Sequence, residues 1–323
     1  MDFIQPYTSL IESELKNLGL PEKPETLYQP QIYILSSSAK RIRPVLTLLG
    51  CGLCGSEIDK AVPAAIAVEL VHNFTLIHDD IMDQAESRRG EPTVHVRWNR
   101  STAILSGDGM FVQALLQLQN LSEDVDFKEI NREFLIGVNR VCEGQALDMD
   151  FEKRLDVTTQ EYLDMIGGKT AALISTSLRM GGMAAGASDE MIEYLGILGE
   201  SLGIAFQIQD DLLDVIADPE KFGKRTGGDI SEGKKTFLMV KTLESCTDSE
   251  REWLTGLLKR RPVSQSNVHK IIDLYKKYGA TDSADALMNE YYSKAVKALD
   301  QFGDSDYKRD LQHLIHYLKK RDF

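Results

Sequence analysis

The chain has 323 residues, of which 42% are hydrophobic and 27% charged, and its formal net charge at pH 7 is −13. This composition is that of an ordinary folded protein with one large hydrophobic core or two smaller ones. The negative charge argues against a nucleic-acid partner, because binding a phosphate backbone requires a broad cationic surface. The first residues show no basic segment followed by an apolar one, and no uncharged apolar run reaches the ~18 residues that span a bilayer. We therefore expect a cytoplasmic protein without a transmembrane segment.

Apolar residues recur at helical spacing in long segments, at 42–53, 61–82, 103–118, 162–183, 191–216 and 268–275. Glycine and proline lie between these segments, as they do at helix ends. Only residues 93–98 alternate as a strand does, and one short alternation cannot form a sheet, so we interpret them as a loop or an isolated extended piece. No linker rich in proline, glycine or serine divides the chain. The sequence predicts an all-α fold in a single domain, residues 1–323.

The chain has four cysteines, Cys51, Cys54, Cys142 and Cys246. Cys51 and Cys54 form a C-x-x-C pair, which could be a redox site or half of a zinc site. No second such pair and no pair of histidines completes a tetrahedral set of ligands. Packing in the core is therefore the favoured role of this pair.

Two clusters of the form Asp-Asp-x-x-Asp occur in apolar helical segments, Asp79, Asp80 and Asp83 in one and Asp210, Asp211 and Asp214 in the other. At ~100° per residue, the three carboxylates of each cluster lie on one side of a helix. A single acidic triplet is usually a solvated helix face, but here each follows apolar residues and the pattern occurs twice. Oxygen ligands of this kind suit Mg²⁺ that bridges carboxylates to phosphate oxygens. The clusters predict a divalent-cation site for a phosphorylated ligand.

Basic side chains and glycines follow each acidic cluster. Arg88 and Arg89 come shortly after the first cluster, and Lys224 and Lys234 after the second. Cationic groups placed just beyond metal-binding carboxylates suit a ligand whose phosphates contact both. Such loops are usually solvated surface, but their recurrence after both clusters favours phosphate binding.

Two further basic segments could join this site. One runs from Lys40 to Arg43 and is followed by Pro44, which is typical of the first turn of a helix, where free N–H groups favour an anion. The other is Lys169-Thr170. The latter is not a P-loop, because Leu163 stands where the first glycine of that motif is required. Neither segment is specific by itself.

With these motifs, the chain resembles the trans-isoprenyl diphosphate synthases from Lys40 to Arg321. The acidic clusters match the two aspartate-rich motifs of that family, in the family's order. The segment from Lys40 to Pro44 is similar to the family's G-G-K-R-x-R-P, although Ser37-Ser38-Ala39 stand where glycines are usual. Smaller family signatures match at Gly144-Gln145, Lys169-Thr170, Phe206-Gln207 and the segment from Gly233 to Thr236.

The resemblance implies an isoprenoid synthase-type helical bundle around a deep central cavity, usually as a homodimer, with the two acidic clusters facing each other across its mouth. It implies that about three Mg²⁺ ions hold an allylic diphosphate through Asp79, Asp83 and Asp210. Asp80, Asp211 and Asp214 would lie nearby or bind through water. The allylic diphosphate would contact Arg88, Lys169, Thr170, Gln207, Lys224 and Lys234.

The second substrate, isopentenyl diphosphate, would lie against Lys40, Arg43, His72 and Arg89. From the residues alone, a histidine such as His72 in an apolar helix is more often part of the core. His72 nevertheless lies about two turns before Asp79 and about 20° from its direction around the helix. Near the reacting allylic carbon, the resemblance places Lys169, Thr170 and Gln207, and Arg321 is similar to a basic tail that closes the site.

The resemblance implies a transferase that condenses isopentenyl diphosphate with allylic diphosphates by Mg²⁺-assisted ionisation. Phe74 and Thr75, just before Asp79, would set product length, and this pattern resembles enzymes that make geranylgeranyl diphosphate (C20). Farnesyl diphosphate (C15) or a mixed product is the alternative. A class I terpene cyclase needs no isopentenyl site, and a non-catalytic synthase subunit would be expected to lack one cluster, so both are less favoured.

Overall fold

The structure is a computed structural model, and it describes residues 2–216, 226–260 and 262–320. Nearly all of these residues are helical. Within the described part of the chain, the only strands are two short ones that form a hairpin, β1 (Ser87–Arg88) and β2 (Glu91–Pro92). The prediction of an all-α fold is confirmed.

The chain divides into two compact units, which we describe separately. Unit 1 comprises Met1–Val138, Thr176–Gly196 and Gln301–Leu311, and unit 2 comprises Asn139–Ser175, Ile197–Asp300 and Gln312–Phe323. The first acidic cluster belongs to unit 1 and the second to unit 2. The single domain expected from the sequence stays a prediction.

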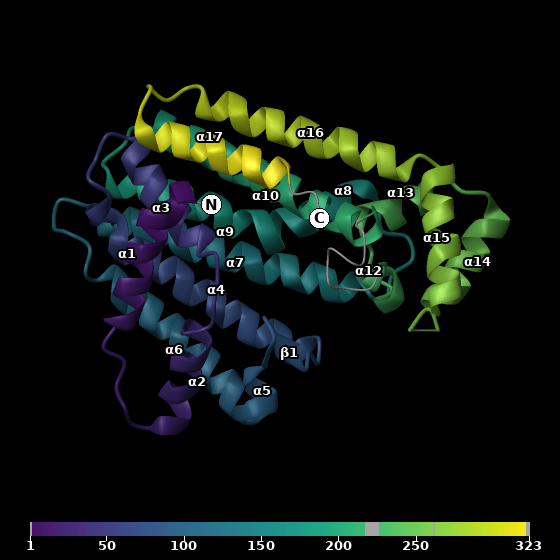
Figure 1. Cartoon of the computed structure of the whole chain (residues 1–323), viewed down its shortest axis with the longest axis horizontal. Helices are drawn as coiled ribbons and strands as arrows, with labels where there is room; N and C mark the ends of the chain where they lie inside the picture. The colour runs from purple at the N-terminus through teal and green to yellow at the C-terminus, as the bar shows by residue number, and fades with distance from the viewer. Residues whose placement is uncertain (1, 217–225, 261, 321–323) are drawn as a thin grey trace. The chain divides into compact units, whose positions relative to one another are not determined.

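Unit 1 contains the helices of the N-terminal part of the chain (Figure 1). They are the 3₁₀ helices η1 (Asp2–Ile4) and η2 (Ile58–Ala61) and the α-helices α1 (Gln5–Lys16), α2 (Glu25–Leu35), α3 (Ile42–Leu53), α4 (Val62–Met82), α5 (Val94–Arg97) and α6 (Arg100–Leu118). Four helices have residues in both units, namely α7 (Phe127–Phe151), α9 (Ala172–Ala184), α10 (Asp189–Ile216) and α17 (Asp306–Lys319).

The other helices belong to unit 2. They are α8 (Thr159–Ile166), the π-helix η3 (Gly167–Ala171), α12 (Gly228–Glu232), α13 (Phe237–Ser245), α14 (Asp248–Leu258), α15 (Gln265–Lys277) and α16 (Ala280–Leu299). Their buried faces carry large side chains, among them Tyr162, Tyr275 and Tyr292, which are almost fully buried. Interiors of this kind are packed as closely as organic crystals.

The core of unit 1 is formed by α3 and α4, and α4 runs beside α6 (Figure 1). Small residues allow the close approach of α3 to its neighbours. A Cβ atom on Gly50 would lie 2.5 Å from the carbonyl oxygen of Leu178. Helix α4 ends at Asp83, whose N–H donates to the carbonyl oxygen of Asp79. This helix end therefore places the first acidic cluster on a rigid element.

The helices expected from apolar periodicity are confirmed, most closely for α3 and α4. Two local expectations differ from the structure. Residues 162–183 do not form one regular helix, because η3 interrupts it between α8 and α9. The interpretation of residues 93–98 as a loop or an isolated extended piece was wrong, since α5 forms there. The Thr93 hydroxyl donates to the carbonyl oxygen of Ala85 at 2.7 Å, and this contact fixes the start of the short helix.

Cys51 and Cys246 are buried, Cys54 is half-buried, Cys142 is exposed, and all four are free thiols. Burial raises the pKa of the Cys51 and Cys54 thiols to about 11. Thiols protonated at neutral pH are poor nucleophiles. The pair therefore packs in unit 1, as expected, and lacks the character of a redox site.

Two helical stretches are long and apolar enough to cross a membrane by length and composition alone, Ile58–Met82 and Asp189–Ile216. In each, 61% of the most apolar window is buried inside the protein. Buried core helices pass the same criterion, so this is weak evidence for a membrane span. The absence of a transmembrane segment stays a prediction.

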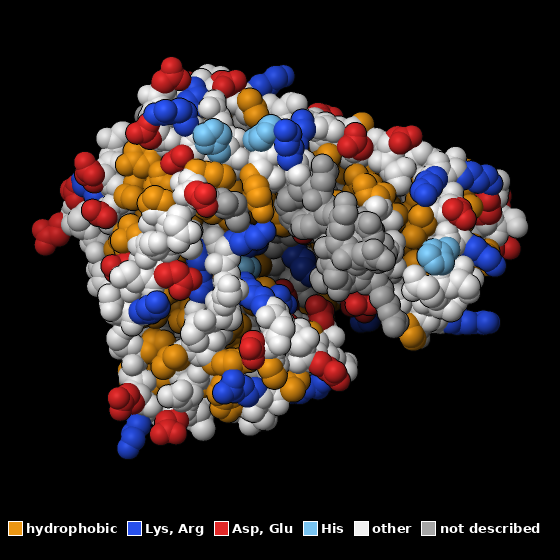
Figure 2. Space-filling view, in the orientation of Figure 1, with side chains coloured by type: hydrophobic (Ala, Val, Ile, Leu, Met, Phe, Trp, Pro, Cys, Tyr) orange, Lys and Arg blue, Asp and Glu red, His pale blue; other side chains and the backbone are white. Residues whose placement is uncertain are grey.

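Large hydrophobic side chains are exposed on α6 and α7. On the face drawn in Figure 2, hydrophobic side chains are visible among acidic and basic ones. The exposed large hydrophobic residues of these two helices are Ile104, Leu105, Val112, Leu116, Phe127, Leu135, Ile136 and Met149. On α6, Leu105, Val112 and Leu116 are spaced seven and four residues apart, so they share one face of the helix.

Candidate active site

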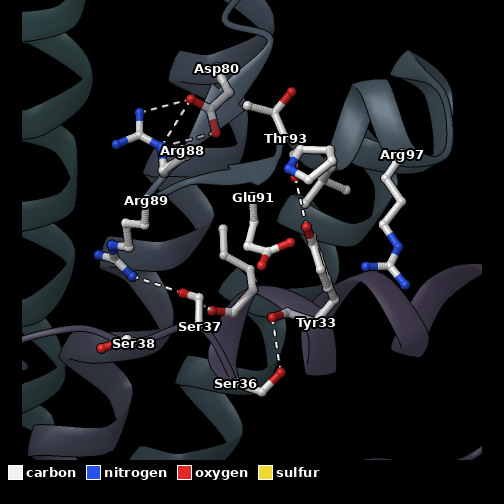
Figure 3. A pocket seen from close by; sticks show the side chains of 13 residues that line it. Tyr33, Ser36, Ser37, Ser38, Asp80, Arg88, Arg89, Glu91, Thr93 and Arg97 are labelled. Atoms are coloured by element: carbon white, nitrogen blue, oxygen red, sulfur yellow. Dashed lines mark hydrogen bonds and ion pairs between the residues drawn. The ribbon is translucent and has the colours of Figure 1, made fainter.

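The first acidic cluster lies at the C-terminal end of α4, and its members differ in exposure. Asp83 is exposed, Asp79 is half-buried, and Asp80 is only 2% exposed. The carboxylate of Asp80 accepts hydrogen bonds from Arg88 Nε at 2.9 and 3.0 Å and pairs with Arg88 Nη2 at 2.8 Å (Figure 3). Asp80 thus fixes Arg88, while Asp79 and Asp83 lie nearer the surface.

The hairpin after α4 presents Arg88 and Arg89 side by side. Arg88 pairs with Glu91, so Arg89 and Gly90 form a two-residue turn in which both have positive φ, 55° and 81°. Turns of this type match the twist of the strands but favour glycine at both positions. Arg89 adopts the conformation, and its Nη1 donates to Ser37 Oγ at 2.9 Å.

Arg41 ties together the segment that carries Lys40 and Arg43. It is buried, with a φ of 49°, and its guanidinium pairs with Glu12 at 2.7 Å and with Glu69 at 2.6 Å. The same guanidinium donates to the carbonyl oxygens of Leu35 and Ser37. A buried charge is stable only when it is paired and hydrogen-bonded, as it is here.

Arg43 and His72 are half-buried and contact each other in unit 1, with Arg43 Nη1 3.1 Å from His72 Nε2. Burial, followed by the positive charges of Arg43, Arg89, Arg88 and Arg41, lowers the pKa of His72 well below its ordinary value. His72 is therefore neutral at pH 7, and its Nε2 accepts the hydrogen bond from Arg43.

The basic residues of unit 1 are arranged to receive an anion. Burial lowers the pKa of Arg43 and of Arg89, and their positive neighbours add to this effect although Glu69 opposes it. Among the ion pairs of the described residues, none joins Arg43 or Arg89 to a carboxylate. A diphosphate bound there would supply the missing negative charge.

A cavity of about 440 Å³ lies beside these groups in unit 1. Hydroxyl, guanidinium and carboxylate groups line it (Figure 3). The lining residues are Tyr33, Ile34, Ser36, Ser37, Ser38, Asp80, Arg88, Arg89, Glu91, Pro92, Thr93, Val94 and Arg97. The cavity thus brings Arg88 and Arg89 together with Asp80.

Phe74 and Thr75, the residues expected to set product length, lie on α4. The Phe74 ring is 4.8 Å from the His78 ring and 5.9 Å from that of Phe111 on α6, between centroids. Phe111 in turn stacks on Phe134 at 6.5 Å. The Thr75 hydroxyl donates to the carbonyl oxygen of His72 at 2.8 Å. Phe111 and Phe134 were not predicted from the sequence, because the contacts of Phe111 with Phe74 and of Phe134 with Phe111 are purely tertiary.

The second acidic cluster lies on α10, in unit 2. Asp211 is buried, and its carboxylate accepts hydrogen bonds from the Tyr162 hydroxyl, the Gln207 amide and the Phe237 N–H. Asp214 accepts from the N–H groups of Gly228 and Asp229 at 3.1 and 3.2 Å, at the start of α12. Asp210 is half-buried.

Burial, followed by the negative charge of Asp229, raises the pKa of Asp211 to about 7 and that of Asp214 to about 6. Such shifts arise where carboxylates are crowded and poorly solvated. A bound divalent cation would relieve the repulsion and favour the ionised forms. Clustered pKa shifts of this kind are frequent at functional sites.

Lys169 and Thr170 lie in η3. Lys169 Nζ pairs with Asp148 at 2.6 Å, and Thr170 Oγ1 donates to Gln207 Oε1 at 2.9 Å. Lys234 pairs with Asp229 at 3.1 Å and with Glu232 at 2.9 Å. Asp148 was not expected from the sequence. Lys224 and Arg321, which the sequence also proposed, lie outside the described residues.

The acidic side chains fit Mg²⁺ as partial ligand sets. Among the described residues, no group of three or more His, Cys, Asp or Glu side chains is close enough to hold a metal ion without other ligands. Mg²⁺ at phosphate sites is typically bound through one or two carboxylates, with water and phosphate oxygens completing the shell. Asp79 and Asp83 at one helix end of unit 1 fit that requirement.

Comparisons with known proteins agree with these observations. Residues 24–275 match the family model described as polyprenyl synthetase. The short chain isoprenyl diphosphate synthase of Methanothermobacter thermautotrophicus is 38% identical over all of this chain and 98% of its own. The geranylgeranyl diphosphate synthase of Sulfolobus acidocaldarius is 41% identical over 85% of this chain and 84% of its own.

Among solved structures, the geranylgeranyl pyrophosphate synthetase of Pyrococcus horikoshii Ot3 has a TM-score of 0.93 and 37% identity to this chain. The match covers 99% of this chain and 97% of that one. Sequence and fold thus agree over almost the whole length. The chain belongs to the polyprenyl synthetase family.

Proposed function

We propose that the protein is a trans-prenyltransferase that condenses isopentenyl diphosphate with allylic diphosphates, with geranylgeranyl diphosphate as its main product. The observation that carries this proposal is the arrangement in unit 1. There, Asp79 and Asp83 lie at the C-terminal end of α4, Asp80 holds Arg88, and Arg43 and Arg89 lack a carboxylate partner among the described ion pairs. Family membership and the names of the relatives support it.

The allylic diphosphate would be held by Asp79, Asp83 and Asp210 through about three Mg²⁺ ions, which neutralise the diphosphate as it leaves. Asp80, Asp211 and Asp214 would lie near these ligands or bind through water. Arg88, Lys169, Lys224 and Lys234 would contact the phosphates. For this pose, the two acidic clusters must face the same substrate, which is a prediction of the proposal.

Isopentenyl diphosphate would bind to Lys40, Arg43 and Arg89, with His72 behind Arg43. Charge-assisted hydrogen bonds from guanidinium groups to phosphate are short and strong, and arginine can make two in parallel. The left-handed turn at Arg89 and the contact with Ser37 hold one guanidinium in place before substrate arrives. Such preorganisation reduces the entropic cost of binding.

Lys169, Thr170 and Gln207 would surround the allylic carbon that becomes positive when the C–O bond breaks. Oxygen atoms aimed at a developing positive charge stabilise it most in a site that excludes water. The double bond of isopentenyl diphosphate then attacks this carbon, and a proton leaves C2 of the added unit. The released diphosphate is the expected proton acceptor.

The growing chain would run along α4 from Asp79 toward Phe74 and Thr75. The ring of Phe74, with Phe111 and Phe134 behind it, is suited to stop the chain. We favour C20 as the product because relatives with that name match this chain closely. A C15 or mixed product is the alternative.

We further propose that the enzyme is a cytoplasmic homodimer. The exposed apolar side chains of α6 and α7 favour association with a second copy, because large exposed apolar surface commonly marks interfaces. A twofold axis would bring the same face of each copy together.

The activity test uses the purified protein with isopentenyl diphosphate and, in turn, dimethylallyl, geranyl and farnesyl diphosphate. Each reaction is run with Mg²⁺ and with a chelator, and the dephosphorylated alcohols are sized by chromatography. We expect Mg²⁺-dependent formation of C20 alcohol. Cyclic hydrocarbons, or no product with any starter, would contradict the proposal.

A further inference from the structure

A continuous chain of hydrogen bonds in unit 2 connects a buried tyrosine to the π-helix. The Tyr162 hydroxyl donates to Asp211 Oδ2 at 2.7 Å, and Gln207 Nε2 donates to Asp211 Oδ1 at 3.1 Å. Thr170 Oγ1 donates to Gln207 Oε1 at 2.9 Å. We call these four residues, Tyr162, Asp211, Gln207 and Thr170, the relay.

One end of the relay is rigid. Tyr162 and Asp211 are almost fully buried, and the Tyr162 ring packs edge-on against Phe237 with 6.0 Å between centroids. The N–H of Phe237 also donates to Asp211 Oδ2, at 3.2 Å. Three donors therefore converge on one carboxylate, and none of them can move without leaving a buried polar group unpaired.

The hydrogen bonds of the relay run in one direction, because the Gln207 amide nitrogen faces Asp211 Oδ1. The ionised form of Asp211 only accepts hydrogen bonds and therefore favours this orientation of Gln207. The amide oxygen then faces Thr170 and receives the hydroxyl proton. The orientation of a glutamine amide is assigned from such a network, and here the donors around Asp211 together with ionised Asp211 support this orientation. The Thr170 hydroxyl is left with only lone pairs to offer to another group.

The main chain beside Thr170 is equally constrained. A Cβ atom on Gly144 would overlap the backbone nitrogen of Lys169, and one on Gly168 would lie 2.7 Å from the carbonyl oxygen of Arg140. η3 therefore packs closely against α7. Short π-helices are uncommon and occur often at functional sites. With the backbone fixed, the relay decides what the Thr170 side chain presents.

We propose that Tyr162 and Asp211 are positioning residues that orient Gln207, so that Thr170 presents its oxygen lone pairs, and not its proton, to the reacting allylic carbon. This inference rests on the proposed function. A hydroxyl that pointed its proton at a forming cation would destabilise it, whereas an oxygen lone pair stabilises it. In this arrangement, Asp211 acts through Gln207 and needs no direct contact with a metal ion.

The first test replaces Tyr162 by phenylalanine, which keeps the ring packing and removes one donor from Asp211. We expect kcat to fall roughly tenfold, with the KM for isopentenyl diphosphate within about twofold of the wild-type value. The matched control is Tyr292→Phe. Tyr292 is equally buried, and its hydroxyl donates at 2.7 Å to Gln209, which lies on α10 as Gln207 and Asp211 do. Tyr292 is not part of the relay. We expect Y292F to keep the wild-type kcat.

The second test is a double-mutant cycle between Tyr162 and Thr170. Thr170→Val removes the hydroxyl at the end of the relay and keeps its shape. If Tyr162 acts through Thr170, adding Y162F to T170V changes kcat by less than about twofold. Full additivity of the two effects would overturn the proposal, because it would mean that Tyr162 contributes to packing alone. If Y162F fails to fold, Asp211→Asn takes its place in the cycle.

The third measurement does not depend on activity. The side-chain amide signals of Gln207 in a ¹⁵N–¹H spectrum, assigned by their loss in Gln207→Glu, should shift in Y162F and stay unchanged in Y292F. An unchanged Gln207 signal in Y162F would refute the relay even if the protein proved to have another activity. Conversely, wild-type protein that forms no prenyl product, with the expected shift in Y162F, would refute the proposed function and leave the relay intact.

Discussion

The second aspartate of each acidic cluster is its most buried member. Asp80 is 2% exposed and Asp211 is 4% exposed, and each accepts hydrogen bonds from groups of its own unit. The reason is helical geometry, since the second position is rotated by ~100° from the first, toward the packed side of the helix. Asp80 fixes Arg88 and Asp211 fixes Gln207. The same motif thus supplies carboxylates for the proposed cations and an anchor for a neighbouring polar side chain.

His72 shows how burial decides the chemistry of a side chain. Its position among arginines keeps it neutral, so it acts as an acceptor for Arg43 and cannot serve as a cation for phosphate. Below about pH 6.5, the unfolded chain binds a proton at His72 and the folded protein does not. The free energy of unfolding therefore decreases as the pH falls through this range. Above that pH, His72 has no effect on the pH dependence of stability.

We predict that His72→Gln preserves function and His72→Leu does not. The glutamine oxygen can accept the hydrogen bond from Arg43, whereas leucine leaves that buried donor unpaired, at a cost of about 1–3 kcal/mol. The KM for isopentenyl diphosphate should stay within about threefold in H72Q and rise roughly tenfold or more in H72L. Steady-state kinetics at pH 6, 7 and 8 test this, and a step in KM over that range in the wild type would contradict a neutral His72.

Helix α4 connects the first acidic cluster to the aromatic residues. It carries Asp79 and Asp80 in its last turn and Phe74 just before them, facing Phe111 of α6. The hairpin after α4 then returns Arg88 to Asp80. One helix and its following turn therefore fix the distance between the proposed diphosphate site and the Phe74 ring, which is proposed to stop the growing chain.

The sequence predicted these elements because apolar periodicity and glycine or proline breaks are local signals. It did not predict η3, since the close contact of Gly144 with Lys169 joins residues distant in the chain. Helix α5 was missed because alternating valines resemble a strand until the Thr93 hydrogen bond is known. The ion pair between Arg41 and Glu69 was not predicted either, because in the sequence Glu69 is a single acidic residue in an apolar helix.

We predict that Phe74→Ala lengthens the main product by at least one isoprene unit. Loss of the ring opens space between α4 and α6, in front of Phe111. The cost in stability should be below the ~3–5 kcal/mol typical of a fully buried phenylalanine, since Phe74 is half-buried. Product alcohols are sized by chromatography, with Phe127→Ala on the exposed face of α7 as control. The same product distribution in F74A and wild type would remove Phe74 from this role.

At the scale of the whole molecule, two compact units each carry one acidic cluster and their own set of basic residues. Neither unit has the full set expected for ionisation and condensation. The proposed reaction therefore needs residues of both, and the family model spans both, from residue 24 to 275. The exposed apolar face of α6 concerns assembly. Its water-exposed leucine and valine side chains lie in one row, which favours their burial against a partner.

This face gives a prediction about assembly. Val112 on α6 is 52% exposed and Val96 on α5 is 50% exposed, so Val112→Glu and Val96→Glu change equally accessible residues of one type. A glutamate at a buried interface would be desolvated without a partner, whereas one on free surface costs little. Light scattering coupled to size-exclusion chromatography should show a dimer for wild type and V96E and a monomer for V112E. A dimeric V112E would place the interface elsewhere, and a monomeric wild type would show that the α6 face stays uncovered by a second copy.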